Sequence, residues 1–281
     1  MRALTRGALI GALVLTQGPL GGCETPAIRA YQQTATAKGL VQHTVDGEPF
    51  AHRVYLNDAA VARHPGRLNV YLDGDGIPWR GYAQPALEPT ARDPLVLRLM
   101  ALDPGPAVYL GRPCYLGVYE PARCIPWHWT HGRYSETVVA SMVQALHRII
   151  DRQRVDELTL IGYSGGGALA MLIAPRLVGV SRVITLAANL DLKAWVDHHG
   201  YSPLSGSLDP AQQPPLPTHI AQWHWVGGHD RAVPPAVVEK GLAHQSGAHF
   251  EVIPAIDHAC CWEAHWPRLL EVAAHASYPT R

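Results

Sequence analysis

LTLIGYSGGGALAML, residues 158–172, decides the fold of this chain because it joins an apolar run typical of a buried strand to one typical of a helix. Between the two runs, residues 162–166 (GYSGG) form a G-x-S-x-G pattern. At a sharp turn from strand to helix, such a serine exposes its Oγ at the end of the sheet, and the glycines let helix and strand approach closely. The stretch therefore predicts that Ser164 is a nucleophile. Taken alone, the pattern also fits an ordinary glycine-rich turn.

The composition fits one folded globular domain. Hydrophobic residues make up 47% of the 281 residues and charged residues 16%, against roughly 25% charged in average proteins. The 23 Lys and Arg balance the 23 Asp and Glu, and neither sign forms a long run that would contact a phosphate backbone. A nucleic-acid partner is therefore not expected.

The first residues have the pattern of an export signal. Arg2 and Arg6 give a positive start, and the apolar stretch at 8–15 is too short to cross a bilayer as a helix. Residues 20–23 (LGGC) resemble a bacterial lipobox, at which cleavage leaves Cys23 as a lipid-bearing first residue. An ordinary signal peptide, cut nearby, is the alternative.

This pattern predicts the organisation of the chain and its location. We expect a signal peptide with lipobox at 1–22, an N-terminal tether at 23–50 and the folded domain at 51–281. Acyl chains on Cys23 would anchor the protein to a membrane, since each buried methylene contributes about 0.8 kcal/mol. The expected location is the cell envelope, as an exported lipoprotein that faces the periplasm or the outer surface.

Export places the other cysteines in an oxidising compartment. Cys114 and Cys124 lie in one Gly/Pro-rich segment, which predicts a local disulfide, with two free thiols as the alternative. Cys260 and Cys261 are adjacent, and a bond between neighbours requires an unusual peptide geometry. Two buried thiols are expected for this pair, although the sequence does not decide their redox state.

The rest of the chain alternates between two patterns. Short continuous apolar runs, typical of parallel strands buried on both faces, occur at 68–72, 107–110, 158–161, 183–186, 220–226 and 250–253. Helical spacing occurs at 135–150, 166–177, 235–244 and 264–276. The fold class is therefore α/β, a three-layer α/β/α sandwich with a mostly parallel sheet. Two irregular stretches, 74–92 and 191–217, are expected as small caps over the carboxyl ends of the strands, where such sheets bind ligands.

A serine nucleophile requires a base and a group that orients this base. Asp230 follows the strand pattern at 220–226, and His258 follows the one at 250–253. The order serine, acid, histidine, each just after a strand, is the order of the α/β-hydrolase triad. Three positional matches are more specific than the serine motif alone.

From about residue 68 to its end, the chain resembles the α/β-hydrolase superfamily. The resemblance rests on the GxxDxxVP-like stretch at 227–234, on DH-x-x-x-W at 257–262, and on the G-x-S-x-G pattern. The segment DGDG at 73–76 makes it similar, more narrowly, to exported bacterial serine hydrolases of unassigned substrate. The resemblance implies Ser164 as the nucleophile, His258 as the general base and acid, and Asp230 as the orienting group, with no cofactor.

Other residues compete for the roles of base and acid. The rivals of His258 are His198, His199, His224 and His229. His224 lies within a strand pattern, and the other three do not follow the last strand. Asp191 follows the strand at 183–186, a position that some superfamily members use for the acid. Asp257 neighbours His258, but adjacent side chains diverge too strongly for it to hold the imidazole.

Acyl transfer also requires N–H donors for the charge that develops on the carbonyl oxygen. In this fold one donor follows the nucleophile, here Gly165. The family pattern assigns the second to Asp75, with Gly76 as a near alternative. Because a carboxylate at this place would oppose the developing charge, we expect the side chain of Asp75 to point away.

The reaction follows from these assignments, whereas the substrate does not. Aromatic residues near the motifs are candidates for the wall of a substrate pocket, namely Trp79, Tyr163, Trp195 and Trp262. The histidines lack metal-binding spacing, so no metal is expected. We predict a serine esterase of lipase type that acts on a small or lipid-like ester through a covalent acyl-enzyme. An acyltransferase with the same triad and a non-catalytic lipoprotein that binds ligands are the alternatives.

Overall fold

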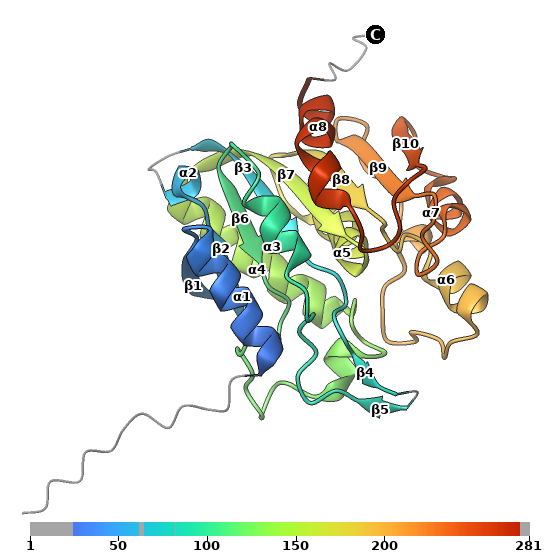
Figure 1. Cartoon of the computed structure of the whole chain (residues 1–281), viewed down its shortest axis with the longest axis horizontal. Coiled ribbons are helices and arrows are strands. Elements are labelled where there is room, and N and C mark those ends of the chain that lie inside the picture. Colours follow the sequence, from blue (N-terminus) through green and yellow to red (C-terminus); the bar gives the residue numbers. More distant parts are fainter. Residues whose placement is uncertain (1–24, 62–64, 82, 276–281) are drawn as a thin grey trace, which may run out of the picture.

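A central sheet of eight strands runs through the molecule (Figure 1). The computed structural model describes residues 25–61, 65–81 and 83–275, so Cys23 and the expected signal peptide lie outside the described residues. The strand order is β1-β2-β6-β3-β7-β8-β9-β10. Strand β2 is antiparallel to its neighbours β1 and β6, and the pairs from β6 to β10 are parallel. The strands are β1 (Val41–Asp46), β2 (Ala51–Leu56), β3 (Gly66–Leu72), β6 (Ala107–Leu110), β7 (Val155–Tyr163), β8 (Val180–Leu186), β9 (Ala221–Gly227) and β10 (Ala248–Ile253).

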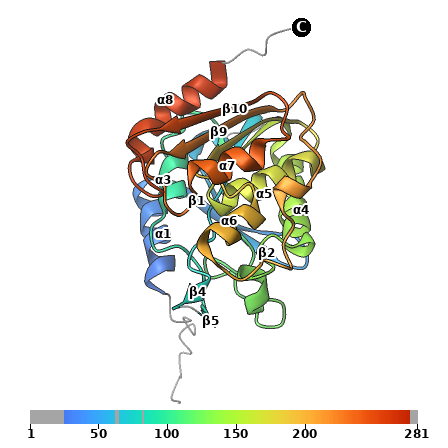
Figure 2. The ribbon, with the colours of Figure 1, turned by 90° about the vertical axis from the view of Figure 1, so that its right-hand side faces the viewer.

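Helices cover both faces of this sheet, which confirms the predicted three-layer sandwich. Figure 2 shows α1 and α3 on one side of the strands and α4 and α5 on the other. Along β3, Leu68 and Val70 belong to the core cluster under α4 and α5, whereas Tyr71 belongs to the cluster under α1, α3 and α8. The helices are α1 (Pro26–Ala37), α2 (Asp58–Val61), α3 (Leu95–Met100), α4 (Glu136–Gln153), α5 (Gly165–Ile173), α6 (Leu192–His199), α7 (Pro235–Leu242) and α8 (Trp262–His275).

Short elements complete the segments between the long ones. Strands β4 (Trp79–Arg80) and β5 (Gln84–Pro85) form a separate hairpin. Three single turns of 3-10 helix lie at η1 (Pro126–Trp129), η2 (Ala174–Arg176) and η3 (Pro210–Gln212). The helix expected at 166–177 ends earlier, at Ile173, since Pro175 lacks an N–H and the chain continues as the tighter turn η2.

The N-terminal stretch differs from the expected tether. Residues 26–46 form helix α1 and strand β1, which pairs with β2 along its whole length. Tyr31 and Ala35 are buried against the sheet, and the side chain of Thr25 caps the helix by accepting from the N–H of Ile28. The apolar face that packs on the sheet is narrow, which explains why the polar composition of this stretch concealed the helix.

The structure joins the cysteines in two pairs. Cys114 and Cys124 form a disulfide, as predicted. The expectation of two buried thiols at Cys260 and Cys261 is wrong, because both residues are exposed and bonded to each other. They lie in the surface turn that leads into α8, where the N–H of Cys260 donates to the carboxylate of Asp257. Within the part of the chain that the structure describes, no helix is long and apolar enough to cross a membrane.

Two histidines are buried in the sheet and are uncharged. His52 donates from Nδ1 to the carbonyl of Gly111 at 2.9 Å and accepts at Nε2 from the hydroxyl of Ser141 at 2.8 Å. Burial lowers the pKa of His52 to about 4 and that of His224 to about 3. A neutral ring with its proton on Nδ1 satisfies both of these hydrogen bonds.

These histidines make the stability of the fold fall as the pH falls. In the unfolded chain a histidine takes up a proton near pH 6.5, whereas His52 in the folded state resists protonation down to about pH 4. The unfolded state therefore binds more protons, and stability is lost as the pH falls. Between about pH 7.5 and about pH 5.5, His52 is expected to contribute about 1.4 kcal/mol to this loss.

The measurement is the free energy of unfolding in urea at both pH values for the wild type and for His52→Gln. The variant should lose less stability between the two values than the wild type does. His147→Gln, at an exposed position of α4, is the matched control and should keep the wild-type difference. An unchanged pH dependence in His52→Gln would contradict the assignment of a neutral buried ring.

Candidate active site

Ser164 lies at the turn between β7 and α5 in a backbone conformation that serine rarely adopts. Its φ is 51° and its ψ is −122°. The backbone groups of Ser164 are all held: its N–H donates to the carbonyl of Leu186 at 2.8 Å, and its carbonyl accepts from Gly167 at 2.9 Å and from Asn189 at 3.3 Å. This is the strained strand-to-helix turn that the sequence predicts, and it presents the Oγ at the end of the sheet.

Close contact between the helix and the strands makes the turn possible. A Cβ atom on Gly162 would overlap the carbonyl of Gly166, and one on Gly166 would overlap the carbonyl of Leu72. Helix α5 therefore begins directly on β7 and β3 with no side chain between the backbones. Larger residues at these two positions would push the helix away and move Ser164.

His258 and Asp230 complete a chain of hydrogen bonds with Ser164. The Nε2 atom of His258 is 3.1 Å from the Oγ of Ser164, and its Nδ1 is 2.8 Å from the Oδ2 of Asp230. The side chain of Asp230 is fully buried, and its other oxygen accepts from the N–H groups of Ala232 and Val233. An ionised Asp230 accepts from Nδ1–H, which leaves Nε2 free to accept from the serine hydroxyl.

The structure places the competing residues elsewhere. Asp191 caps α6 by accepting from the N–H of Ala194, and Asp257 accepts from the N–H groups of Ala259 and Cys260. His224 is buried in β9 beside Thr185. Three histidines lie outside the hydrogen-bond chain, with His198 and His199 at the end of α6 and His229 exposed in the loop after β9.

Two aromatic side chains hold the backbone of His258. The hydroxyl of Tyr163 and the Nε1–H of Trp262 each donate to the carbonyl of His258 at 2.9 Å. Trp262 is completely buried in the core under α8 and does not line the cavity, so its expected role as a substrate contact is wrong. The sequence shows that Tyr163 and Trp262 lie near the predicted catalytic residues, but only the structure shows that both bind the carbonyl of His258.

The carboxylate of Asp75 is surrounded by donors. Arg112 contacts one carboxylate oxygen at 2.5 Å, Arg133 contacts the other at 2.8 Å, and the hydroxyl of Tyr134 lies 2.7 Å from both. Burial alone would raise the pKa of Asp75, but Arg133, Arg112 and Tyr134 outweigh it and lower the pKa to about 2. Asp75 is therefore ionised, and its charge is neutralised in place.

The expectation that this side chain points away from the site is wrong. A Cβ atom on Gly165 would overlap the Oδ1 of Asp75, so the carboxylate lies against the residue that follows the nucleophile. Two guanidinium groups make this position tolerable, because they cancel the charge that would oppose a developing oxyanion.

Three backbone N–H groups belong to Gly165, which follows Ser164, and to two residues of the cavity wall. Gly165 begins α5, and Asp75 and Gly76 lie in the loop after β3. Among the residues that the structure describes, no protein acceptor takes the N–H of any of these three. Amides at the start of a helix and in a glycine-rich loop are the donors that bind an oxyanion in this fold.

The loop after β3 is also tied to the N-terminal helix. Asp73 is buried and accepts from the hydroxyls of Tyr31 at 2.5 Å and Tyr109 at 2.9 Å, and from the N–H of Gly74 at 2.8 Å. Burial raises the pKa of Asp73. Helix α1 thus supports the site through Tyr31, a contact that no motif indicated.

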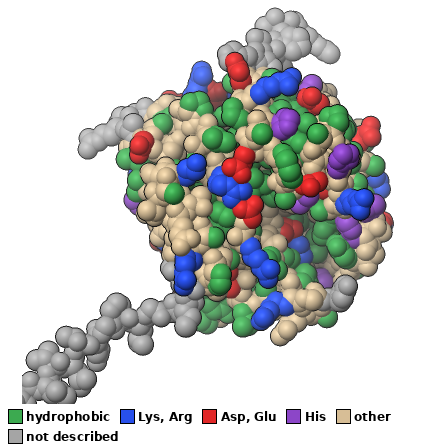
Figure 3. Space-filling view, viewed as in Figure 1, with side chains coloured by type: hydrophobic (Ala, Val, Ile, Leu, Met, Phe, Trp, Pro, Cys, Tyr) green, Lys and Arg blue, Asp and Glu red, His purple; other side chains and the backbone are tan. Residues whose placement is uncertain are grey.

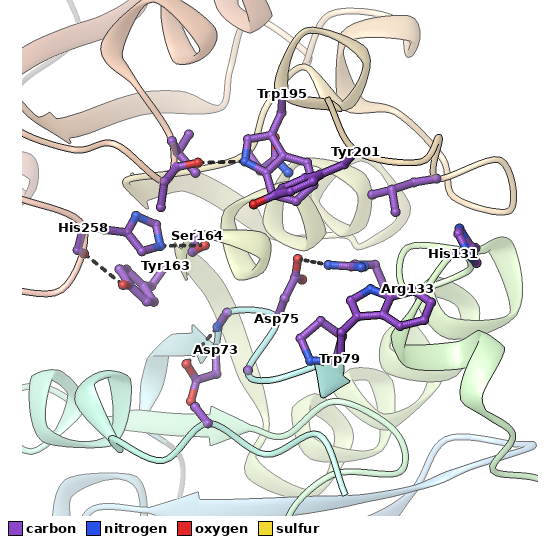
Figure 4. A pocket seen from close by; sticks show the side chains of 18 of the residues that line it. Asp73, Asp75, Trp79, His131, Arg133, Tyr163, Ser164, Trp195, Tyr201 and His258 are labelled. Atoms are coloured by element: carbon purple, nitrogen blue, oxygen red, sulfur yellow. Dashed lines mark hydrogen bonds and ion pairs between the residues drawn. The ribbon is translucent and has the colours of Figure 1, made fainter. Parts of the chain in front are cut away.

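Ser164 and His258 face a cavity of about 790 Å³, which lies between the β4–β5 hairpin and α6 and forms a hollow in this face of the molecule (Figure 3). Figure 4 shows Trp79 and His131 on one side and Trp195 and Tyr201 on the other. Trp79, Tyr163 and Trp195 line the cavity as expected. Both irregular stretches contribute to its wall, so they cap the carboxyl ends of the strands as the sequence predicts.

The described residues contain no group of three or more His, Cys, Asp or Glu side chains arranged to hold a metal ion.

Solved structures share this fold. The chain is similar to a membrane phospholipase A described as a bacterial virulence factor, with a TM-score of 0.57 and 15% identity over 89% of this chain and 93% of that one. The mouse α/β-hydrolase domain-containing protein 10 gives 0.56 and 13% identity over 84% and 100%. Naproxen esterase from Bacillus subtilis gives 0.53 and 12% over 87% and 97%. No protein-family model and no curated protein sequence matches the chain. The comparisons show the α/β-hydrolase fold.

The Asp75 cluster predicts a large loss of stability when its charge is removed. Asp75→Asn would leave two buried guanidiniums without their shared carboxylate, and breaking a buried pair in this way costs about 3 kcal/mol or more. Asp93→Asn, which breaks an exposed ion pair with Arg98, should cost less than about 1 kcal/mol. Urea unfolding at neutral pH measures both, and similar small losses would contradict the assigned role of Asp75.

Proposed function

We propose that this protein is a serine hydrolase that cleaves carboxylic esters through a covalent acyl-enzyme. The observation that carries the proposal is the hydrogen-bond chain Ser164–His258–Asp230, with distances of 3.1 and 2.8 Å, at the mouth of a cavity of about 790 Å³. A serine hydroxyl is a weak nucleophile at neutral pH, and a base at its Oγ with an acid behind that base removes this limitation.

The residues act in two half-reactions. As the Oγ of Ser164 attacks the ester carbonyl, Nε2 of His258 takes the hydroxyl proton, and Asp230 stabilises the resulting imidazolium. The N–H groups of Gly165 and Asp75 bind the oxyanion, with Gly76 as the alternative to Asp75. His258 then protonates the leaving alcohol. A water molecule attacks the acyl-enzyme with His258 again as base, which releases the acid and restores Ser164.

Esters are the proposed substrate class because an alcohol leaves more readily than an amine. The aromatic wall formed by Trp79, Trp195 and Tyr201 suits the organic part of such a substrate. Similarity in fold to a phospholipase A and to a naproxen esterase is consistent with this class.

We also propose that the protein is exported and anchored to a membrane through acyl chains on Cys23. The support is the sequence pattern: a positive start, a short apolar stretch and LGGC at 20–23. The anchor would hold the enzyme at a membrane surface, while the described domain carries the chemistry.

Ser164→Ala tests the catalytic proposal directly. The wild type should be labelled by a fluorophosphonate, and the variant should lose both the label and at least about a thousandfold in kcat toward p-nitrophenyl butyrate, because triad members act as a unit. Ser202→Ala is the matched control, since Ser202 lines the same cavity but has no contact with His258. Persistent labelling of Ser164→Ala would overturn the assignment of the nucleophile.

Cys23→Ser tests the anchor. The full-length protein expressed in a bacterium should fractionate with membranes, and the variant should move to the soluble fraction because it cannot be acylated. Cys114→Ser separates this effect from the loss of a cysteine as such, and it should remain with the membranes. Unchanged fractionation of Cys23→Ser would refute lipidation.

A further inference from the structure

Two buried arginines lie beside the nucleophile and bind the same carboxylate. Arg112 and Arg133 share the single carboxylate of Asp75, and their side chains are 2% and 4% exposed. Asp73, the next buried acid, is occupied by the hydroxyls of Tyr31 and Tyr109. Arg133 therefore shares its carboxylate partner with Arg112, and a guanidinium in a site of low water content binds a further anionic acceptor strongly where a ligand offers one.

Arg133 is the member of the cluster that faces the cavity. Its Nε donates to the carbonyl of Thr130 at 2.7 Å, and its Nη1 binds Asp75. Within the described residues, its Nη2 has no acceptor and is not among the atoms sealed from solvent. Arg112 differs, because its Nη1 and Nη2 bind Asp75 and the carbonyl of Arg133, and it does not line the cavity. In Figure 4 Arg133 extends into the site toward Asp75.

A second polar group in the wall lacks a partner. Asn189 is 2% exposed and lines the cavity, and its Oδ1 is buried with no hydrogen bond to the described residues. Its backbone N–H binds the carbonyl of Ser164, so this side chain adjoins the nucleophile. This Oδ1 is an acceptor and needs an N–H or O–H donor, so it has no part in binding an anion. A fatty acyl chain in this part of the cavity would leave the Nη2 of Arg133 unpaired, and an unpaired polar group away from water loses binding energy.

We propose that Arg133 binds an ionised carboxylate of the substrate, so that the preferred substrates are esters that carry a second, anionic carboxylate group. The inference rests on the proposed hydrolase function and names the substrate class of the same site. The Nη2 of Arg133, which has no acceptor among the described residues, matches a carboxylate, and the aromatic walls at Trp79 and Trp195 receive the carbon skeleton.

The experiment compares pairs of esters in which a free carboxylate is present or is capped as its methyl ester, and the ratio of the wild type is read against that of the variants. In one pair the carboxylate is on the acyl part: mono-p-nitrophenyl adipate against its methyl-capped, neutral form. In the other it is on the leaving group: 4-acetoxybenzoate against methyl 4-acetoxybenzoate. For one pair at least, the wild type should show a kcat/KM about tenfold or more higher for the anionic ester, and high salt should reduce this ratio.

The variants locate the preference. In Arg133→Met the ratio of anionic to neutral kcat/KM should fall to about one, and Arg133→Lys, which keeps the charge, should retain part of it. Arg80→Met is the matched control, because Arg80 is exposed on the neighbouring hairpin and does not line the cavity; its ratio should equal that of the wild type. The ratio is taken within each variant, so a partly folded variant does not bias it.

The outcomes distinguish this inference from the proposed function. If the wild type hydrolyses charged and neutral esters with equal efficiency in both pairs, the carboxylate site is overturned and the hydrolase function stands. If it hydrolyses none of the four esters and resists fluorophosphonate, the hydrolase function itself fails. A preference that survives in Arg133→Met would also overturn the inference. Competition by free adipate against the neutral ester tests the site without any variant, and absence of competition would count against it.

Discussion

The direct contact between the backbones of β7, β3 and α5 is the constraint on which the site depends. Gly162 and Gly166 leave no side chain between helix and strands, so the turn at Ser164 is forced into a φ of 51°. Such a conformation costs of the order of 1–3 kcal/mol and persists only when its surroundings fix it. Here Leu186, Gly167 and Asn189 fix it through hydrogen bonds to the backbone of Ser164, and the Oγ lies 3.1 Å from the Nε2 of His258.

The loop after β3 carries a carboxylate close to the residue that follows the nucleophile. An aspartate at position 75 places a carboxylate against Gly165, where a developing oxyanion would meet repulsion. Arg112, Arg133 and Tyr134 remove the repulsion without removing the carboxylate, which then anchors the loop and directs its backbone. Asp75 therefore fixes the position of its own N–H through the contacts of its side chain.

Sequence reasoning predicts the part of the site that follows strands. Ser164, Asp230 and His258 each come just after a continuous apolar run, and parallel strands bring their carboxyl ends together. The partners of Asp75 are 37 to 59 residues distant and follow no such rule, so only the structure reveals them. Trp262 is a second example. The motif gives its distance from His258 along the chain, but it does not tell whether the side chain faces the core or the cavity. Helix α1 was concealed by polar residues around a narrow apolar face.

In the proposed function the Asp75 cluster would connect rate and specificity, because Arg133 both binds Asp75 and lines the cavity. A substrate carboxylate at the Nη2 of Arg133 would leave the bond from Nη1 to Asp75 in place. Asp75 is held as well by Arg112, which binds the other carboxylate oxygen, and by Tyr134, which contacts both. Arg112 does not line the cavity, and its Nη1 and Nη2 bind Asp75 and the carbonyl of Arg133. In the proposed function the two arginines therefore have different parts: Arg112 holds the carboxylate of Asp75, and Arg133 holds it through Nη1 while its Nη2 remains for a ligand.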